Sequence, residues 1–286
     1  MLSARIAACL EKQQLRDAAL AGMARMELEL KTARELQLSM VPTVFPAPNA
    51  QWPIELAAVL EPALELGGDF YDFFRLRSGA QCFAVGDVCD KGVAAALFMA
   101  RAMSTVRLVA SVAEGPAAPA DWVAAANEEL CGNNATNMFA TLLLGVLDPL
   151  SGELTLVNAG NVEPWLIDPA NGARRLMTNK RVPLGVRVDA RYEAFTTHLD
   201  AGATLFICTD GVTEATDPGG DLFGDARTES ILTRLAACCA REVIDGVMTE
   251  LRAFVASAPQ ADDIAALAVR RVGTLACDTV QSSRCR

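Results

Sequence analysis

The stretch that decides the fold is "FAVGDVCDKG", residues 83–92. A mostly apolar run ends there on Asp87 and continues into a short polar loop. A second stretch, "ATLFICTDG" at residues 203–211, ends in the same way on Asp210. One Asp-Gly pair after a strand is commonly only a turn. Two such endings predict that buried strands deliver carboxylates to a common edge.

Strand-like and helical patterns follow one another in groups along the chain. The expected strands form hairpin-like runs and the expected helices come in pairs, which differs from the strand–helix alternation of a parallel sheet. The pattern therefore predicts an α+β layered domain with sheets in the middle and helix pairs outside. Expected strands lie within 54–88, 138–168, 193–210 and 263–271, and expected helices at 92–113, 119–131, 226–238 and 241–256.

Residues 1–40 contain no proline and predict one long helix. A 3–4 rhythm typical of a coiled-coil seam covers about two and a half heptads; it is formed by Met23, Met26, Leu30, Ala33, Gln37 and Met40. The helix either packs on its own domain or forms a homodimer and carries a signal. Prolines from Pro42 onward end it. The expected organisation is a helical linker at 1–44, a domain at 45–271 and a flexible tail at 272–286.

Composition excludes several classes of protein. The net charge of −10 and the lack of a long basic patch weigh against nucleic-acid binding. No apolar run is long and charge-free enough to predict a membrane span, and the N-terminus does not resemble a secretory signal. Nine scattered cysteines without a CxxC pair predict free thiols, and hence a cytoplasmic protein. The single histidine, His198, has no cysteine neighbour, so a zinc site is not expected.

Acidic residues beside glycines or strand ends recur at four places: Asp69, Asp87, Asp210 and Asp262-Asp263. Each alone is readily explained as a turn or a strand cap. Together they predict a cluster, and clustered carboxylates repel one another unless a cation neutralises them. An oxygen-only ligand set favours Mg²⁺ or Mn²⁺ over zinc. Two such ions can activate a water for attack on phosphorus, so no nucleophilic side chain is required.

The acid-bearing segments resemble, in order, those of the bacterial PPM-type protein serine/threonine phosphatases. The most similar subgroup is that of the sporulation and stress-response sigma-regulator phosphatases, and the resemblance runs from about Ala33 to Arg271. The segments that carry it are "LEPALELGGDFYDFF", "GDVCDKGVAAALFMA", "FATLLLGVLDPLSGELTLVNAGN", "PLGV", "LFICTDGVTEATD" and "ADDIAAL".

The resemblance implies an α-β-β-α sandwich with two Mn²⁺ or Mg²⁺ ions between two antiparallel sheets. By position, Asp87 matches the acid that bridges both ions, and the Val88 carbonyl matches a backbone ligand. Asp69 matches an acid on the side of the second ion, and Asp210 and Asp262 match the acids that hold the first. Asp263 matches a residue that orients its neighbour, while Asp72 belongs to the motif without an assigned role.

Some positions depart from the family pattern. Asp90 stands where many relatives have glycine, and Asn161 stands where a histidine is frequent. No arginine matches the phosphate-binding arginine of eukaryotic relatives. Lys91 could supply positive charge, but a solvated loop lysine is the preferred interpretation.

The expected function is therefore metal-dependent dephosphorylation of phosphoserine or phosphothreonine on a protein, with the four acids as catalytic residues. By resemblance, the substrate is a small anti-sigma-factor antagonist. An upstream sensor domain or a partner is expected to supply the signal, since residues 1–45 are too short to hold one. The alternatives are a degenerate fold that acts as a binding module, and a phosphatase or phosphodiesterase of small molecules.

Overall fold

The computed structural model describes residues 2–112, 118–132 and 134–273, and it divides the chain into two compact units, Met1–Met40 and Val41–Arg286. Most of the predicted tail at 272–286 thus lies outside the described residues. The first unit is the helix α1 (Leu2–Met40). Several large apolar side chains are exposed along it, among them Met23 and Met26. An ion pair joins Arg25 to Glu29 one turn later, which supports the helix locally.

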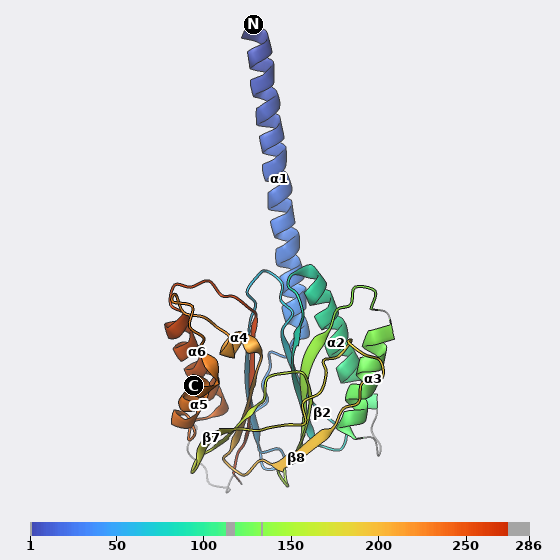
Figure 1. Cartoon of the computed structure of the whole chain (residues 1–286), viewed down its shortest axis with the longest axis vertical. Coiled ribbons are helices and arrows are strands. Elements are labelled where there is room, and N and C mark those ends of the chain that lie inside the picture. Colours follow the sequence, from blue (N-terminus) through green and yellow to red (C-terminus); the bar gives the residue numbers. More distant parts are fainter. Residues whose placement is uncertain (1, 113–117, 133, 274–286) are drawn as a thin grey trace. The chain divides into compact units, whose positions relative to one another are not determined.

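The second unit contains two five-stranded antiparallel sheets (Figure 1). The first sheet has the order β1-β10-β9-β6-β7: β1 (Ile54–Glu61), β10 (Ile264–Arg271), β9 (Thr204–Cys208), β6 (Trp165–Asp168) and β7 (Gly172–Arg175). The second has the order β2-β3-β4-β5-β8: β2 (Phe70–Arg75), β3 (Gln81–Val88), β4 (Ala140–Leu147), β5 (Glu153–Ala159) and β8 (Ala194–His198).

Helices cover the outer face of each sheet (Figure 1). The second sheet carries α2 (Val93–Val112) and α3 (Pro119–Gly132), and the first carries α5 (Gly224–Arg234) and α6 (Ala240–Val255). Three apolar cores hold the layers together: one between the sheets and one beneath each helix pair. The predicted α-β-β-α sandwich is confirmed, as are the expected helices and strands. The sequence reading missed only β7 and the single-turn helix α4 (Asp210–Thr213).

Strand β3 shows why the sandwich forms from this sequence. Its successive side chains point to opposite faces of the sheet, and nearly all of them are apolar and buried. Phe83 and Val85 enter the core between the sheets, whereas Cys82 and Ala84 enter the core beneath α2 and α3. A strand that is apolar on both faces needs cover on both sides, which two sheets and a helix layer provide.

Helix α2 is, among the described residues, the one helix long and apolar enough to cross a membrane by length and composition. Its buried side chains, including Phe98, Met99 and Met103, pack in the core of the second sheet. That packing accounts for its buried face, whereas Val93, Leu97, Leu108 and Val112 of the same helix are exposed.

Candidate metal centre

The alternation of side chains along the strands decides where each acid points. On β2, Tyr71 and Phe73 face the core between the sheets, so Asp69, two residues before Tyr71, projects to the same side. On β3, Asp87 continues the row of Phe83 and Val85 toward that side. The two acids therefore meet between the sheets, and their carboxyl groups are close enough to hydrogen bond to each other.

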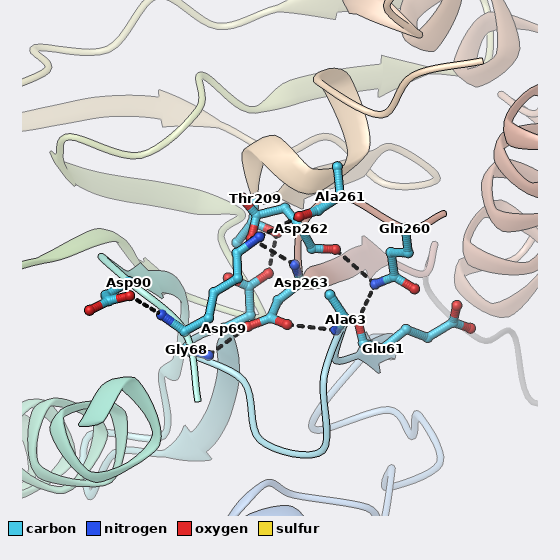
Figure 2. Close-up of polar contacts among 11 residues, drawn as sticks. Glu61, Ala63, Gly68, Asp69, Asp90, Thr209, Gln260, Ala261, Asp262 and Asp263 are labelled. Atoms are coloured by element: carbon cyan, nitrogen blue, oxygen red, sulfur yellow. Dashed lines mark hydrogen bonds and ion pairs between the residues drawn. The ribbon is translucent and has the colours of Figure 1, made fainter. Parts of the chain in front are cut away.

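Asp69 is 2% exposed and is held by a threonine of the opposite sheet. The Thr209 hydroxyl donates to the Asp69 carboxylate at 2.6 Å (Figure 2). The same hydroxyl oxygen accepts from the Ala265 backbone N–H at 3.0 Å. Burial, followed by the negative charge of Asp87, holds the pKa of Asp69 well above its usual range. The threonine bond acts in the opposite direction but does not outweigh burial.

The pKa values of Asp87 and Asp210 are raised as well, again chiefly by burial. Burial, with the nearby charges of Asp210, Asp262 and Asp263, raises the pKa of Asp87 to about 7. Asp210 is the first residue of α4, directly after β9, and burial followed by repulsion from Glu214 raises its pKa as well. Acids from both sheets thus converge on one edge of the sandwich, and their like charges are only partly compensated.

Asp263 fixes the loop that leads to Asp69. Its carboxylate accepts from the Ala63 N–H at 2.7 Å and from the Gly68 N–H at 2.6 Å (Figure 2). Its own N–H donates to the Asp262 carboxylate at 2.8 Å. The side chain is 3% exposed. Asp263 therefore ties segments nearly 200 residues apart in the sequence and also contacts its neighbouring acid.

Asp262 lies nearer the surface and forms an ion pair with Lys91 at 2.9 Å. The Lys91 ammonium also donates to the Ala261 carbonyl. The interpretation of Lys91 as a solvated loop lysine was therefore wrong: the loop after β3 brings its charge to the acid edge. The loop turns at Asp90 with a φ of +70°, a left-handed conformation that glycine adopts most readily. Aspartate is among the few other residues that tolerate this conformation.

Two glycines allow the backbone to approach closely at this edge. A Cβ on Gly68 would lie 2.7 Å from the Val88 carbonyl oxygen, and one on Gly211 would lie 1.8 Å from the Asp263 carbonyl oxygen. Any larger residue would displace the Val88 carbonyl or the start of β10. The glycines beside Asp69 and Asp210 are thus required by packing around the acids.

The residues present suit a hard divalent cation. Asp69, Asp87, Asp210 and Asp262 offer carboxylate oxygens, and burial and mutual repulsion raise the pKa of the first three. A cation with oxygen ligands relieves such repulsion. Within the described part of the chain, no group of three or more His, Cys, Asp or Glu side chains lies close enough together to hold a metal ion without rearrangement. Instead, Asp69 and Asp87 contact each other, and Asp262 forms an ion pair with Lys91.

Three further residues belong to this region; Thr209 and Arg107 escaped the sequence reading, whereas Asn161 was noted there only as a departure from the family pattern. Thr209 is buried and stands directly before Asp210. Its position next to a predicted site acid is the signal by which the sequence could have revealed it. Asn161 is 2% exposed; its amide donates to the Cys208 carbonyl at 3.3 Å, and its oxygen accepts from Thr141, which pairs with Asp87. Asn161 therefore connects the two sheets next to the acids.

The third is Arg107 of α2, which explains Asp72. Asp72 lies on the opposite face of β2 from Asp69 and points toward α2. There the Arg107 Nε donates a hydrogen bond to the Asp72 carboxylate at 2.8 Å. A second contact from the same guanidinium group completes a bidentate pair. The guanidinium also lies over the Phe74 ring at 4.6 Å. Asp72 is thus a structural anchor for α2.

A cavity of about 210 Å³ opens beside the acid edge. Asp262, Gly211 and Glu214 line it on the acidic side, and apolar side chains such as Met248 and Leu251 of α6 form its floor. This cavity adjoins the cluster of acids and is large enough to hold part of a ligand.

The fold is that of the PP2C-type phosphatase domain. The SiaA-PP2C domain of Pseudomonas aeruginosa superposes with a TM-score of 0.74 at 21% identity, covering 87% of this chain and 98% of that one. At this identity the likeness concerns the fold. The family model for Stage II sporulation protein E (SpoIIE) matches residues 77–272. The chain therefore belongs to the SpoIIE family.

Two curated relatives extend the comparison. Protein IcfG of Synechocystis sp. is 32% identical over 272 residues, which cover 85% of this chain and 42% of IcfG. Phosphoserine phosphatase RsbU of Bacillus subtilis is 25% identical over 194 residues, covering 68% of this chain and 56% of RsbU. The chain thus spans about half the length of each of these relatives.

Proposed function

We propose that this chain is a metal-dependent phosphatase that removes phosphate from phosphoserine or phosphothreonine on a partner protein. The observation that carries the proposal is the convergence of four acids from both sheets on one edge, with the pKa of three of them raised. Membership of the SpoIIE family and similarity to the phosphoserine phosphatase RsbU support it.

Asp69, Asp87, Asp210, Asp262 and the Val88 carbonyl would hold two Mn²⁺ or Mg²⁺ ions. Bound ions of this kind lower the pKa of water and stabilise the charge of a transferred phosphoryl group. The protein's own residues position the acids. Thr209 orients Asp69, Asp263 fixes the loop before it, and Lys91 brings a positive charge to Asp262.

The substrate class is a small phosphoprotein of the anti-sigma-factor antagonist type in the cytoplasm. The similarity to RsbU and the SpoIIE family supports this assignment. A sensor domain or a partner protein would supply the input, which agrees with the greater length of both relatives.

The proposal is tested by comparing p-nitrophenyl phosphate, a phosphoserine peptide and a cyclic dinucleotide, each with and without Mn²⁺. We expect the first two to release phosphate only when the ion is present, and the cyclic dinucleotide to remain intact. Hydrolysis of the cyclic dinucleotide alone would indicate a phosphodiesterase. Mn²⁺ uptake by calorimetry without turnover of any substrate would indicate a binding module.

We also propose that α1 forms a homodimer through its seam. Met26→Glu introduces a charge at an exposed seam position, so we expect analytical ultracentrifugation to show loss of dimer. Leu28→Glu is the matched control, since Leu28 is equally exposed but lies away from the seam. Equal effects of the two variants, or a wild type that is monomeric at all concentrations, would contradict the proposal.

A further inference from the structure

The loop between β7 and β8 carries a concentration of positive charge in an otherwise acidic chain. Residues 180–191 contain four basic residues and one acidic residue, a net of +3, whereas the whole chain has a net charge of −10. Arg181, Arg187 and Arg191 line one surface depression, together with Val182, Asp189 and Ala190. The sequence reading, which found only isolated basic pairs, did not detect this cluster.

Exposed apolar side chains lie among these arginines. Val182, Val186 and Val188 are 39%, 50% and 63% exposed. Arg181 and Arg187 form ion pairs with the exposed Glu193 and Asp189, and such surface pairs remain available to another charged partner. Mixed arginine and apolar surface is typical of protein–protein contact sites.

Two asparagines, the buried Asn127 and the partly buried Asn134, hold the backbone of this loop in one conformation. Asn127 of α3, fully buried, donates to the Arg187 carbonyl at 2.7 Å and accepts from the Gly185 N–H at 2.9 Å. Asn134 donates to the Gly185 carbonyl at 3.1 Å. The exposed side chains are therefore presented from a fixed backbone, which lowers the entropy cost of binding.

The loop is continuous with the proposed active site. Leu184 and Ala140 exchange two backbone hydrogen bonds, of 3.0 and 2.8 Å. Ala140 in turn pairs with Val88 across β3 and β4, and the Cys89 N–H donates to the Phe139 carbonyl at 3.0 Å. The basic loop is thus one strand away from the residue after Asp87.

We propose that residues 180–191 form a docking surface for an acidic region of the phosphoprotein substrate, so that the phosphoresidue is delivered to the neighbouring acid edge. The proposal rests on the proposed phosphatase function and specifies its substrate class. The net charge of −10 on the whole chain repels an acidic substrate, so attraction by a separate basic surface favours productive encounter. Exposed valines among the arginines would contact apolar side chains of the same partner.

The test uses two synthetic phosphoserine peptides with the same central sequence, one flanked by glutamates and the other by lysines. The readout is the ratio of their kcat/KM values, with the glutamate peptide in the numerator. For the full-length wild type we expect a ratio above one that declines as salt is added. In R187E/R191E we expect the ratio to fall about tenfold at low ionic strength.

The matched control is R234E/R241E, which reverses two similarly exposed, ion-paired arginines on α5 and α6. It should leave the ratio at the wild-type value. An equal ratio in both double variants would overturn the proposal. So would loop-dependent binding to phosphatidylserine vesicles without any preference between the peptides, which would indicate a membrane surface.

Fluorescence anisotropy of the same labelled peptides on the metal-free full chain separates this proposal from the phosphatase function. Lack of phosphate release from both peptides with Mn²⁺ would contradict the function. Preferential binding of the glutamate peptide that is lost in R187E/R191E would still support the docking surface. Equal binding of both peptides by the wild type would overturn it.

Discussion

Asp87→Asn is expected to abolish Mn²⁺-dependent phosphate release from a phosphoserine peptide while making the metal-free domain more stable. The loss of kcat should be on the order of a thousandfold or more, because several kcal/mol of charge stabilisation depend on correctly held ions. The gain in the free energy of unfolding should be on the order of 1–2 kcal/mol near neutral pH, because one buried like charge is removed. Phosphate assays and urea unfolding measure the two effects.

The pH dependence of unfolding provides a second readout for the same variant. Burial and neighbouring acids raise the pKa of Asp87 to about 7, so the folded metal-free chain keeps a proton that the unfolded chain loses near pH 4. The stability contributed by this proton is present at low pH and is lost as pH rises from about 4 through 7. Asp87→Asn should flatten this decline.

The matched control for Asp87→Asn is Asp90→Asn in the same loop. Asp90 is exposed, and asparagine tolerates its positive φ. Activity within about twofold of the wild type and an unchanged pH profile are expected. Comparable loss of activity in both variants, or full activity in Asp87→Asn, would contradict the role assigned to Asp87.

Arg107→Ala should cost about 3 kcal/mol of unfolding free energy, because it leaves the Asp72 carboxylate buried without its cation. Asp72 is 3% exposed at its side chain, and burial already raises its pKa despite the opposing effect of Arg107. Urea unfolding at neutral pH measures the loss. The loss should shrink in acid, where Asp72 takes up a proton.

Two further variants distinguish the loss of the buried Asp72–Arg107 ion pair from a general loss of packing. The double variant Asp72→Leu/Arg107→Met replaces the pair by apolar side chains and should recover most of the lost stability. Arg101→Ala, on the same helix but paired with the exposed Glu129, should cost less than about 1 kcal/mol. If Arg101→Ala were as damaging as Arg107→Ala, the pair with Asp72 would not explain the effect.

The alternation of side chains along the strands predicts more of this site than the acid-containing motifs do alone. The period-two alternation of β2 separates Asp69 from Asp72: the first shares a face with Tyr71 and Phe73, and the second shares a face with Phe70 and Phe74. Since both faces of the strand are apolar, the pattern could not tell which face meets the other sheet. The sandwich itself could be predicted because strands apolar on both faces need two covering layers.

Other features required the tertiary structure. Lys91 reaches Asp262 across 171 residues, and Thr209 reaches Asp69 across 140, so no local pattern records either contact. The basic loop escaped notice because its arginines are separated by valines and a turn, and only the fold brings them around one depression. Short elements such as β7 and α4 were missed because four residues carry too little periodicity.

The ties from Asp263 to Ala63 and Gly68 have a consequence for biosynthesis. Within its sheet β1 pairs with β10 alone, and β10 follows every other strand of the described domain in the sequence. A nascent or prematurely terminated chain lacks both Asp262 and the clamp on the loop before Asp69. Synthesis must therefore pass residues 262–271 before the acid edge can assemble, so products that stop earlier are expected to lack the proposed activity.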